Sequence, residues 1–188
     1  MREYQIIRLA GAACAVLALS ACAGGNFRPV TDTPVRIGPA YIIRGTTYVP
    51  AAAPAYDAVG YASWYGSESG NRTANGEQFR PGWFTAAHTT LPLPTYVEVT
   101  ALDTGRRIIV RVNDRGPFAL GRIIDLSRGA AEELGMKTQG HGSVRVRRID
   151  PSEKDRKRLR EGRAAARIEP LSGQELQRLR ARLFAKGQ

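Results

Sequence analysis

Short runs of apolar residues separated by turn signals fill the middle of the chain, between residues 59 and 150. Five of these runs, at 61–65, 96–102, 107–112, 121–126 and 143–149, are rich in β-branched and aromatic residues and predict strands. The second and third flank Asp103-Thr104-Gly105, a combination typical of a hairpin.

One helix is predicted in the same region, at 128–134. Ser127 is a favourable N-cap, and Gly135 directly follows the last helical position. Many short strands with a single helix predict a mainly β fold, namely a small closed barrel at residues 59–150. Closure would also remove exposed strand edges without any disulfide.

The segment before this region, residues 22–58, is rich in Pro, Ala and Gly. Proline fixes φ and removes a hydrogen-bond donor, so the segment is predicted to be a mostly extended tether. One group of β-forming residues, at 41–49, surrounds Gly45 and predicts a short hairpin or a segment packed on the edge of the domain.

Two helices are predicted after Pro151, in a basic tail that spans residues 151–188. Ser152 with Asp155, and Ser172 with Glu175, have the spacing of capping boxes. The second helix carries an apolar stripe, formed by Leu176, Leu179 and Leu183. Two interpretations are open: the stripe packs on the barrel, or the basic face binds anionic cell-wall or lipid groups.

The charge of the chain is concentrated in this tail. Lys and Arg number 28 against 17 Asp and Glu, a net charge of +11, of which +6 lies in residues 151–188 and only +3 in residues 59–150. The barrel region is therefore not an obvious nucleic-acid module, and no nucleic-acid partner is expected.

The N-terminus has the pattern of an export signal. Arg2 and Arg8 precede an apolar run at 9–19, which is too short to span a bilayer. Leu19-Ser20-Ala21-Cys22 then resembles the bacterial lipobox. We expect residues 1–21 to be a lipoprotein signal peptide and Cys22 to be lipidated, which would anchor the protein to a membrane facing the periplasm, namely the outer membrane. The alternative is a plain cleaved signal in which Cys22 is incidental.

Several side chains suit a sugar-cleaving cleft. Glu77 follows an Asn-Gly turn, Asp114 ends a predicted strand before Gly-Pro, and His88 is one of only two histidines. Carboxyl groups transfer protons to glycosidic oxygens, and the aromatic faces of Trp64 and Tyr65 could bind sugar rings. Consecutive residues of a strand face opposite sides, so one of these two aromatic rings is expected in the core.

Structural roles explain the same residues equally well. Asp114 could pair with Arg115 or Arg122, Asp125 could support the helix after Ser127, and His88 could be a hydrogen-bonded core residue. The sequence has no zincin, Cys-x-x-Cys, Gly-x-Ser-x-Gly or P-loop pattern, and the spacing of its acidic residues does not indicate a metal site. Neither a metal nor any other cofactor is expected.

Four motifs occur in one order: TANGE at 73–77, AAHTTLP at 86–92, NDRGPF at 113–118 and RIIDLS at 122–127. Together with the segment from Tyr41 they closely resemble the rare lipoprotein A (RlpA) family of septal-ring lytic transglycosylases. The resemblance implies a six-stranded double-psi β-barrel. It also implies endolytic cleavage between N-acetylmuramic acid and N-acetylglucosamine, a preference for denuded glycan strands, and 1,6-anhydro-muramyl products.

The resemblance also implies roles for individual residues. The family's acidic and histidine positions match Glu77, His88 and Asp114, which are the predicted catalytic residues, while Asp125 matches an acidic motif of related barrels. The residues predicted to bind substrate are Trp64, Tyr65, Thr73, Asn75, Asn113, Arg115 and Asp125. The family's C-terminal SPOR domain is not expected here, which leaves septal recruitment open. The alternative function is a non-catalytic peptidoglycan-binding or expansin-like wall protein.

Overall fold

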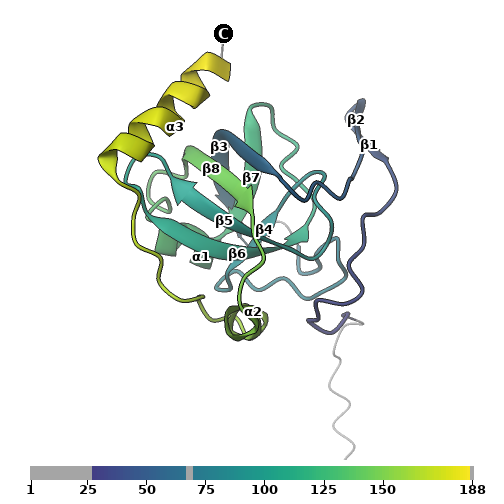
Figure 1. Cartoon of the computed structure of the whole chain (residues 1–188). Coiled ribbons are helices and arrows are strands. Elements are labelled where there is room, and N and C mark those ends of the chain that lie inside the picture. Colours follow the sequence, from purple (N-terminus) through teal and green to yellow (C-terminus); the bar gives the residue numbers. More distant parts are fainter. Residues whose placement is uncertain (1–26, 67–69, 187–188) are drawn as a thin grey trace, which may run out of the picture.

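Six strands form a closed barrel in the order β3-β7-β4-β6-β5-β8 in the computed structural model, which describes residues 27–66 and 70–186 (Figure 1). The strands are β3 (Asp57–Tyr65), β4 (Thr85–Ala87), β5 (Thr95–Ala101), β6 (Arg107–Asp114), β7 (Arg122–Ser127) and β8 (His141–Arg148). The predicted signal peptide and Cys22 lie outside the described residues.

The pairing of the strands is mixed. β3 runs parallel to β7 and β4 runs parallel to β6, whereas the other neighbours are antiparallel. The predicted double-psi β-barrel is confirmed, and all five predicted strands are present. The sixth strand, β4, was not predicted, because its three residues, Thr-Ala-Ala, carry little β-forming signal.

Alternate residues of the strands fill the barrel with an apolar core. Val97 and Val99 of β5 meet Val110 and Val112 of β6, and all four side chains are fully buried. The helix α1 (Arg128–Leu134) packs on this core through residues that include Leu134.

Both ends of α1 are as predicted. The Ser127 hydroxyl accepts a hydrogen bond from the Ala130 N–H at 3.3 Å. Gly135 ends the helix at φ 82°, a left-handed conformation that glycine adopts without steric cost.

The N-terminal segment is extended but lies against the barrel. The Arg28 N–H donates to the Gly76 carbonyl at 2.7 Å, and Arg36 and Leu93 exchange two backbone hydrogen bonds of 2.8 Å. The hairpin predicted at 41–49 is present as β1 (Tyr41–Ile43) and β2 (Thr46–Tyr48). Arg44 and Gly45 form its turn, at φ 49° and 80°. The segment therefore does more than tether the barrel: it covers part of its surface.

The two predicted tail helices are α2 (Glu153–Arg160) and α3 (Gly173–Lys186) (Figure 1). Both capping residues are as predicted, because Ser152 Oγ accepts from the Asp155 N–H at 3.2 Å and Ser172 Oγ from the Glu175 N–H at 3.4 Å. Two of the three stripe leucines, Leu176 and Leu179, are buried, so the stripe packs on the barrel. No helix in the described part of the chain is long and apolar enough to cross a membrane.

Candidate active site

A cleft of about 420 Å³ opens beside the end of β6. Its lining includes two carboxylates, four guanidinium groups and one phenol: Asp114, Asp125, Arg44, Arg72, Arg115, Arg122 and Tyr65. Since arginine stays charged, the cleft has an excess of positive charge even when both carboxylates are ionised. It is equipped for an acid-assisted reaction on a ligand that carries negative charge.

Strand register places the two aspartates on either side of β4. Ala87 pairs with Asp114 of β6 and also with Asp125 of β7. Two strand spacings separate the backbones of the aspartates by about 10 Å. The small Ala87 side chain lies between them and leaves room for a ligand.

Asp114 has the environment of a proton donor. Its Oδ1 accepts hydrogen bonds from the backbone N–H groups of Ala74 and Arg115, both at 2.8 Å. Burial raises the pKa of this carboxyl above its usual value, and the two backbone bonds and the Arg115 charge offset only part of that effect. Asp114 therefore retains its proton to a higher pH than an exposed aspartate.

Asp125 has a hydroxyl donor and a cationic partner. Ser63 Oγ donates a hydrogen bond to its Oδ1 at 2.7 Å, and Arg122 Nε lies 3.3 Å from the same oxygen. Both contacts fix the orientation of the Asp125 carboxyl group in the cleft. Asp125 lines the cleft, as its predicted binding role requires, and remains the second candidate acid.

Tyr65 presents a buried phenol between the two aspartates. Its ring stacks on Phe79 with a centroid distance of 4.8 Å. Its hydroxyl, beside the Thr85 hydroxyl, meets no partner in hydrogen-bond geometry among the described residues. Burial, then the charges of Asp114 and Asp125, raise the pKa of Tyr65 well above its usual value, so the phenol keeps its proton.

Glu77 lies behind the cleft and does not line it. Its carboxylate is 1% exposed and accepts two hydrogen bonds from Arg111, at 2.6 and 2.9 Å. Asn75 and Asn113 donate two more, at 3.0 and 2.9 Å. A carboxylate with four donors and no access to the cleft cannot touch a sugar in this conformation, so Glu77 acts through the residues that it holds.

His88 is also buried, and its ring is a hydrogen-bond acceptor. Nδ1 accepts from the backbone N–H groups of Thr90 and Leu91, both at 3.1 Å, which places the ring proton on Nε2. Burial, and then the Arg115 charge, lower the pKa of His88 to about 4. The His88 N–H donates to the Asp114 carbonyl at 3.0 Å, so this residue contacts Asp114 through the backbone.

The neutral His88 predicts a pH-dependent stability. In the unfolded chain, His88 binds a proton below its ordinary pKa of 6.5, whereas in the folded protein it stays neutral down to about pH 4. The free energy of unfolding is therefore highest above pH 6.5 and decreases as the pH falls towards about 4. The loss should reach about 3 kcal/mol. Urea unfolding between pH 7 and 4 should show it, and His88→Asn, which can still accept a hydrogen bond, should lack it. Equal pH dependence in both proteins would contradict this role.

The other predicted binding residues lie in different places. Thr73, Asn75 and Asn113 are buried and hold the loop around Glu77, so their predicted contact with substrate is not supported by this structure. Trp64 packs against the core and donates Nε1–H to the Lys137 carbonyl at 3.2 Å, away from the cleft. Only Tyr65 of the two aromatic residues reaches the cleft, as the alternation of a strand requires.

Arg115 lines the cleft, but its guanidinium is committed. It donates to the carbonyls of His88, Leu91 and Ile37 at 3.2, 2.5 and 3.0 Å. The cleft arginines that were not predicted as binding residues are Arg44, Arg72 and Arg122. Two of them had a signal in the sequence, because Arg122 lies in the RIIDLS motif and Arg44 lies in the segment from Tyr41 that shares the family resemblance. Arg72 had none.

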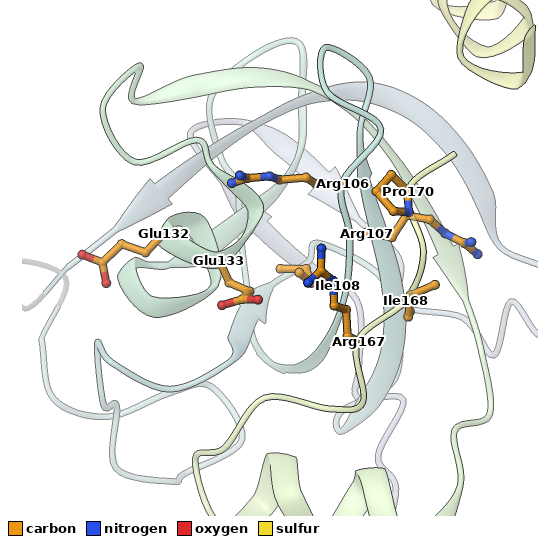
Figure 2. Close-up of a pocket in the computed structure, with 8 residues that line it drawn as sticks. All are labelled: Arg106, Arg107, Ile108, Glu132, Glu133, Arg167, Ile168 and Pro170. Atoms are coloured by element: carbon orange, nitrogen blue, oxygen red, sulfur yellow. The ribbon is translucent and has the colours of Figure 1, made fainter. Parts of the chain in front are cut away.

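Two further features bear on the location of the site. Among residues 27–66 and 70–186, no three His, Cys, Asp or Glu side chains group as a metal site would require. A second cavity of about 350 Å³ lies between α1 and the segment before α3 (Figure 2). Its lining mixes Arg106, Arg107 and Arg167 with Glu132 and Glu133, and none of the predicted site residues belongs to it.

The barrel region is similar to a family of known proteins. Residues 57–146 match the family described as "Lytic transglycolase". The Endolytic peptidoglycan transglycosylase RlpA of Pseudomonas aeruginosa strain UCBPP-PA14 is 55% identical over 113 residues, 59% of this chain and 33% of the relative. Proteins with the same name from Rickettsia bellii and Pasteurella multocida are 47% and 42% identical, over 59% and 76% of this chain and 51% and 49% of theirs. The matched region thus spans between a third and about half of these relatives.

Proposed function

Since the chain belongs, through its barrel, to the RlpA family, we propose that it is an endolytic peptidoglycan lytic transglycosylase with Asp114 as its acid. The observation that carries the proposal is a half-buried carboxyl with a raised pKa in an open cleft of about 420 Å³. No other cleft carboxyl combines burial with freedom from an ion pair, because Asp125 is paired with Arg122.

The reaction requires one group that first gives and then takes a proton. Protonated Asp114 would donate to the oxygen that joins C1 of N-acetylmuramic acid to N-acetylglucosamine, and the C1–O bond breaks. The resulting carboxylate would accept the proton of the muramyl 6-hydroxyl as that oxygen bonds to C1. Because the nucleophile belongs to the same sugar, no water is consumed and the product is a 1,6-anhydro sugar.

The charge of the cleft supports a preference for denuded strands. N-acetylmuramic acid without a stem peptide carries a free lactyl carboxylate, whereas an attached peptide converts that group into an amide. Arg44, Arg72 and Arg122 line the cleft around the acid and can bind such a carboxylate. An uncharged sugar backbone alone would have no need of them.

Mass spectrometry of glycan digests tests this function. Purified strands with and without stem peptides would be incubated with the protein, and the ends of the fragments identified. We expect 1,6-anhydro ends, with faster cleavage of denuded strands. Reducing ends would make the protein a hydrolase, and intact strands that still bind it would favour the alternative, a non-catalytic or expansin-like wall protein.

We also propose that the protein is exported and held at the outer membrane, facing the periplasm, by a lipid on Cys22. The motif at 19–22 supports this anchor. Cys22→Ala should abolish acylation, leave the precursor unprocessed by the lipoprotein peptidase and remove metabolic labelling with palmitate. Cys14→Ala is the matched control, because that cysteine lies within the apolar run. Normal processing and membrane fractionation of Cys22→Ala would contradict the anchor.

A further inference from the structure

The Asp114 carboxylate depends on a loop for one of its two backbone donors. Ala74, whose N–H binds Asp114 Oδ1, lies in the loop 73–77. This loop is closed by hydrogen bonds from the Thr73 N–H to the Glu77 carbonyl at 2.9 Å and from the Gly76 N–H to the Thr73 carbonyl at 2.8 Å. Movement of the loop as a unit would therefore displace the donor from the acid.

Arg111 fixes this loop from the outer face of β6. Its two terminal nitrogens donate to both oxygens of Glu77, and both side chains are 1% exposed. A buried ion pair of this kind depends on good geometry and on the satisfaction of its remaining donors. Arg111 has three further N–H donors: Nε–H and a second hydrogen on each terminal nitrogen.

Residues from the N-terminal segment accept hydrogen bonds from two of these three donors. Arg111 Nε donates to Asp32 Oδ1 at 3.1 Å, and a terminal nitrogen donates to the Thr31 carbonyl at 2.6 Å. The Tyr96 hydroxyl donates to both oxygens of Asp32, at 2.8 and 2.9 Å. Asp32 thus holds the buried guanidinium at Nε, while Glu77 binds its two terminal nitrogens.

The C-terminal tail completes the arrangement. Arg160, in the last turn of α2, forms an ion pair with Asp32. The helix is fixed there because Leu159 is fully buried against Tyr96 and Ile109, and the Arg156 guanidinium lies 5.0 Å from the centre of the Tyr96 ring. Arg160 and Asp32 therefore extend the ion pair of Arg111 and Glu77 into a row of alternating positive and negative charges.

We propose that Asp32 and Arg160 are positioning residues for the acid: by holding Arg111 they fix Glu77, and with it the loop whose Ala74 N–H binds Asp114. The N-terminal segment and the tail are then parts of the catalytic apparatus. The inference rests on the proposed function for its consequence in catalysis, and on the contacts alone for its consequence at Ala74.

Two variants interrupt the arrangement and two serve as references. Asp32→Asn and Arg160→Gln remove one charge each, Arg160→Lys restores the charge, and Lys157→Gln changes an exposed residue on the same helix. We expect kcat on soluble glycan to fall by about 10-fold to 100-fold in the first two, with KM within about twofold. Arg160→Lys should recover part of the loss, and Lys157→Gln should match the original protein.

The pH profile separates positioning from a general loss of structure. The Ala74 hydrogen bond lowers the pKa of Asp114, so its loss should raise that pKa and move the falling, high-pH limb of kcat to higher pH. The other groups that face Asp114 or line its cleft, Arg44, Tyr65, Arg72, Arg115, Arg122 and Asp125, are unchanged in these variants.

The Ala74 amide resonance tests the same contact without any activity. In ¹⁵N spectra of the full chain, the chemical shift of this amide should titrate with Asp114. Asp32→Asn and Arg160→Gln should change the chemical shift and raise the pH at the midpoint of its titration. An unchanged resonance and midpoint in both variants would overturn the proposal. A shifted resonance in a protein that cleaves no glycan would overturn only the proposed function.

Discussion

Asp114→Asn is expected to reduce the rate of glycan cleavage by about 10²-fold to 10⁴-fold, the usual contribution of a general acid. The amide can still accept the hydrogen bonds from Ala74 and Arg115, so the fold should be retained. Measurement of anhydro ends by mass spectrometry, with circular dichroism as a check on folding, tests the prediction. The activity of the original protein should fall as the pH rises through the raised pKa of Asp114, because the acid must be protonated.

Asp125→Asn is the matched comparison, since Asp125 lies across β4 in the same cleft. We expect a loss of less than about tenfold, because this carboxylate is ion-paired with Arg122 and is not needed as a donor. The reverse order of effects would move the acid to Asp125.

Arg111→Met is expected to have the largest effect on stability. It leaves the Glu77 carboxylate buried at 1% exposure without its cation, and loss of one partner of a buried ion pair costs about 3–5 kcal/mol. Chemical denaturation should show this decrease in the free energy of unfolding.

Arg145→Met provides the comparison at the surface. Arg145 pairs with Asp57 where both side chains are more than 20% exposed, so its replacement should cost at most about 1 kcal/mol. If Arg111→Met proved equally mild, Glu77 would have to be protonated or otherwise compensated, and its place in the positioning of Asp114 would need revision.

The sequence by itself determined most of the barrel. The strands at 96–102 and 107–112, the capped helix after Ser127 and the hairpin around Gly45 depend on local preferences that any chain with these residues would have. Only the shortest strand of the barrel, Thr85–Ala87, was missed, because its pairing with β6 and β7 rather than its own residues makes it a strand.

The division of roles among the predicted catalytic residues was decided by the tertiary structure. Motif spacing groups Glu77, His88 and Asp114, but it cannot show that only Asp114 lines the cleft while the other two are buried behind it. Burial depends on which segments cover a strand, and that is settled by contacts between residues far apart in the chain.

The N-terminal segment and the C-terminal tail show the same difference between local signals and long-range contacts. Proline content predicted an extended N-terminal segment and capping boxes predicted two tail helices, since both features depend on neighbouring residues. That Arg160 pairs with Asp32, 128 positions away, while Asp32 also binds Arg111 could not be predicted, because charge pairing between distant segments follows from the packing of Leu159 on the barrel.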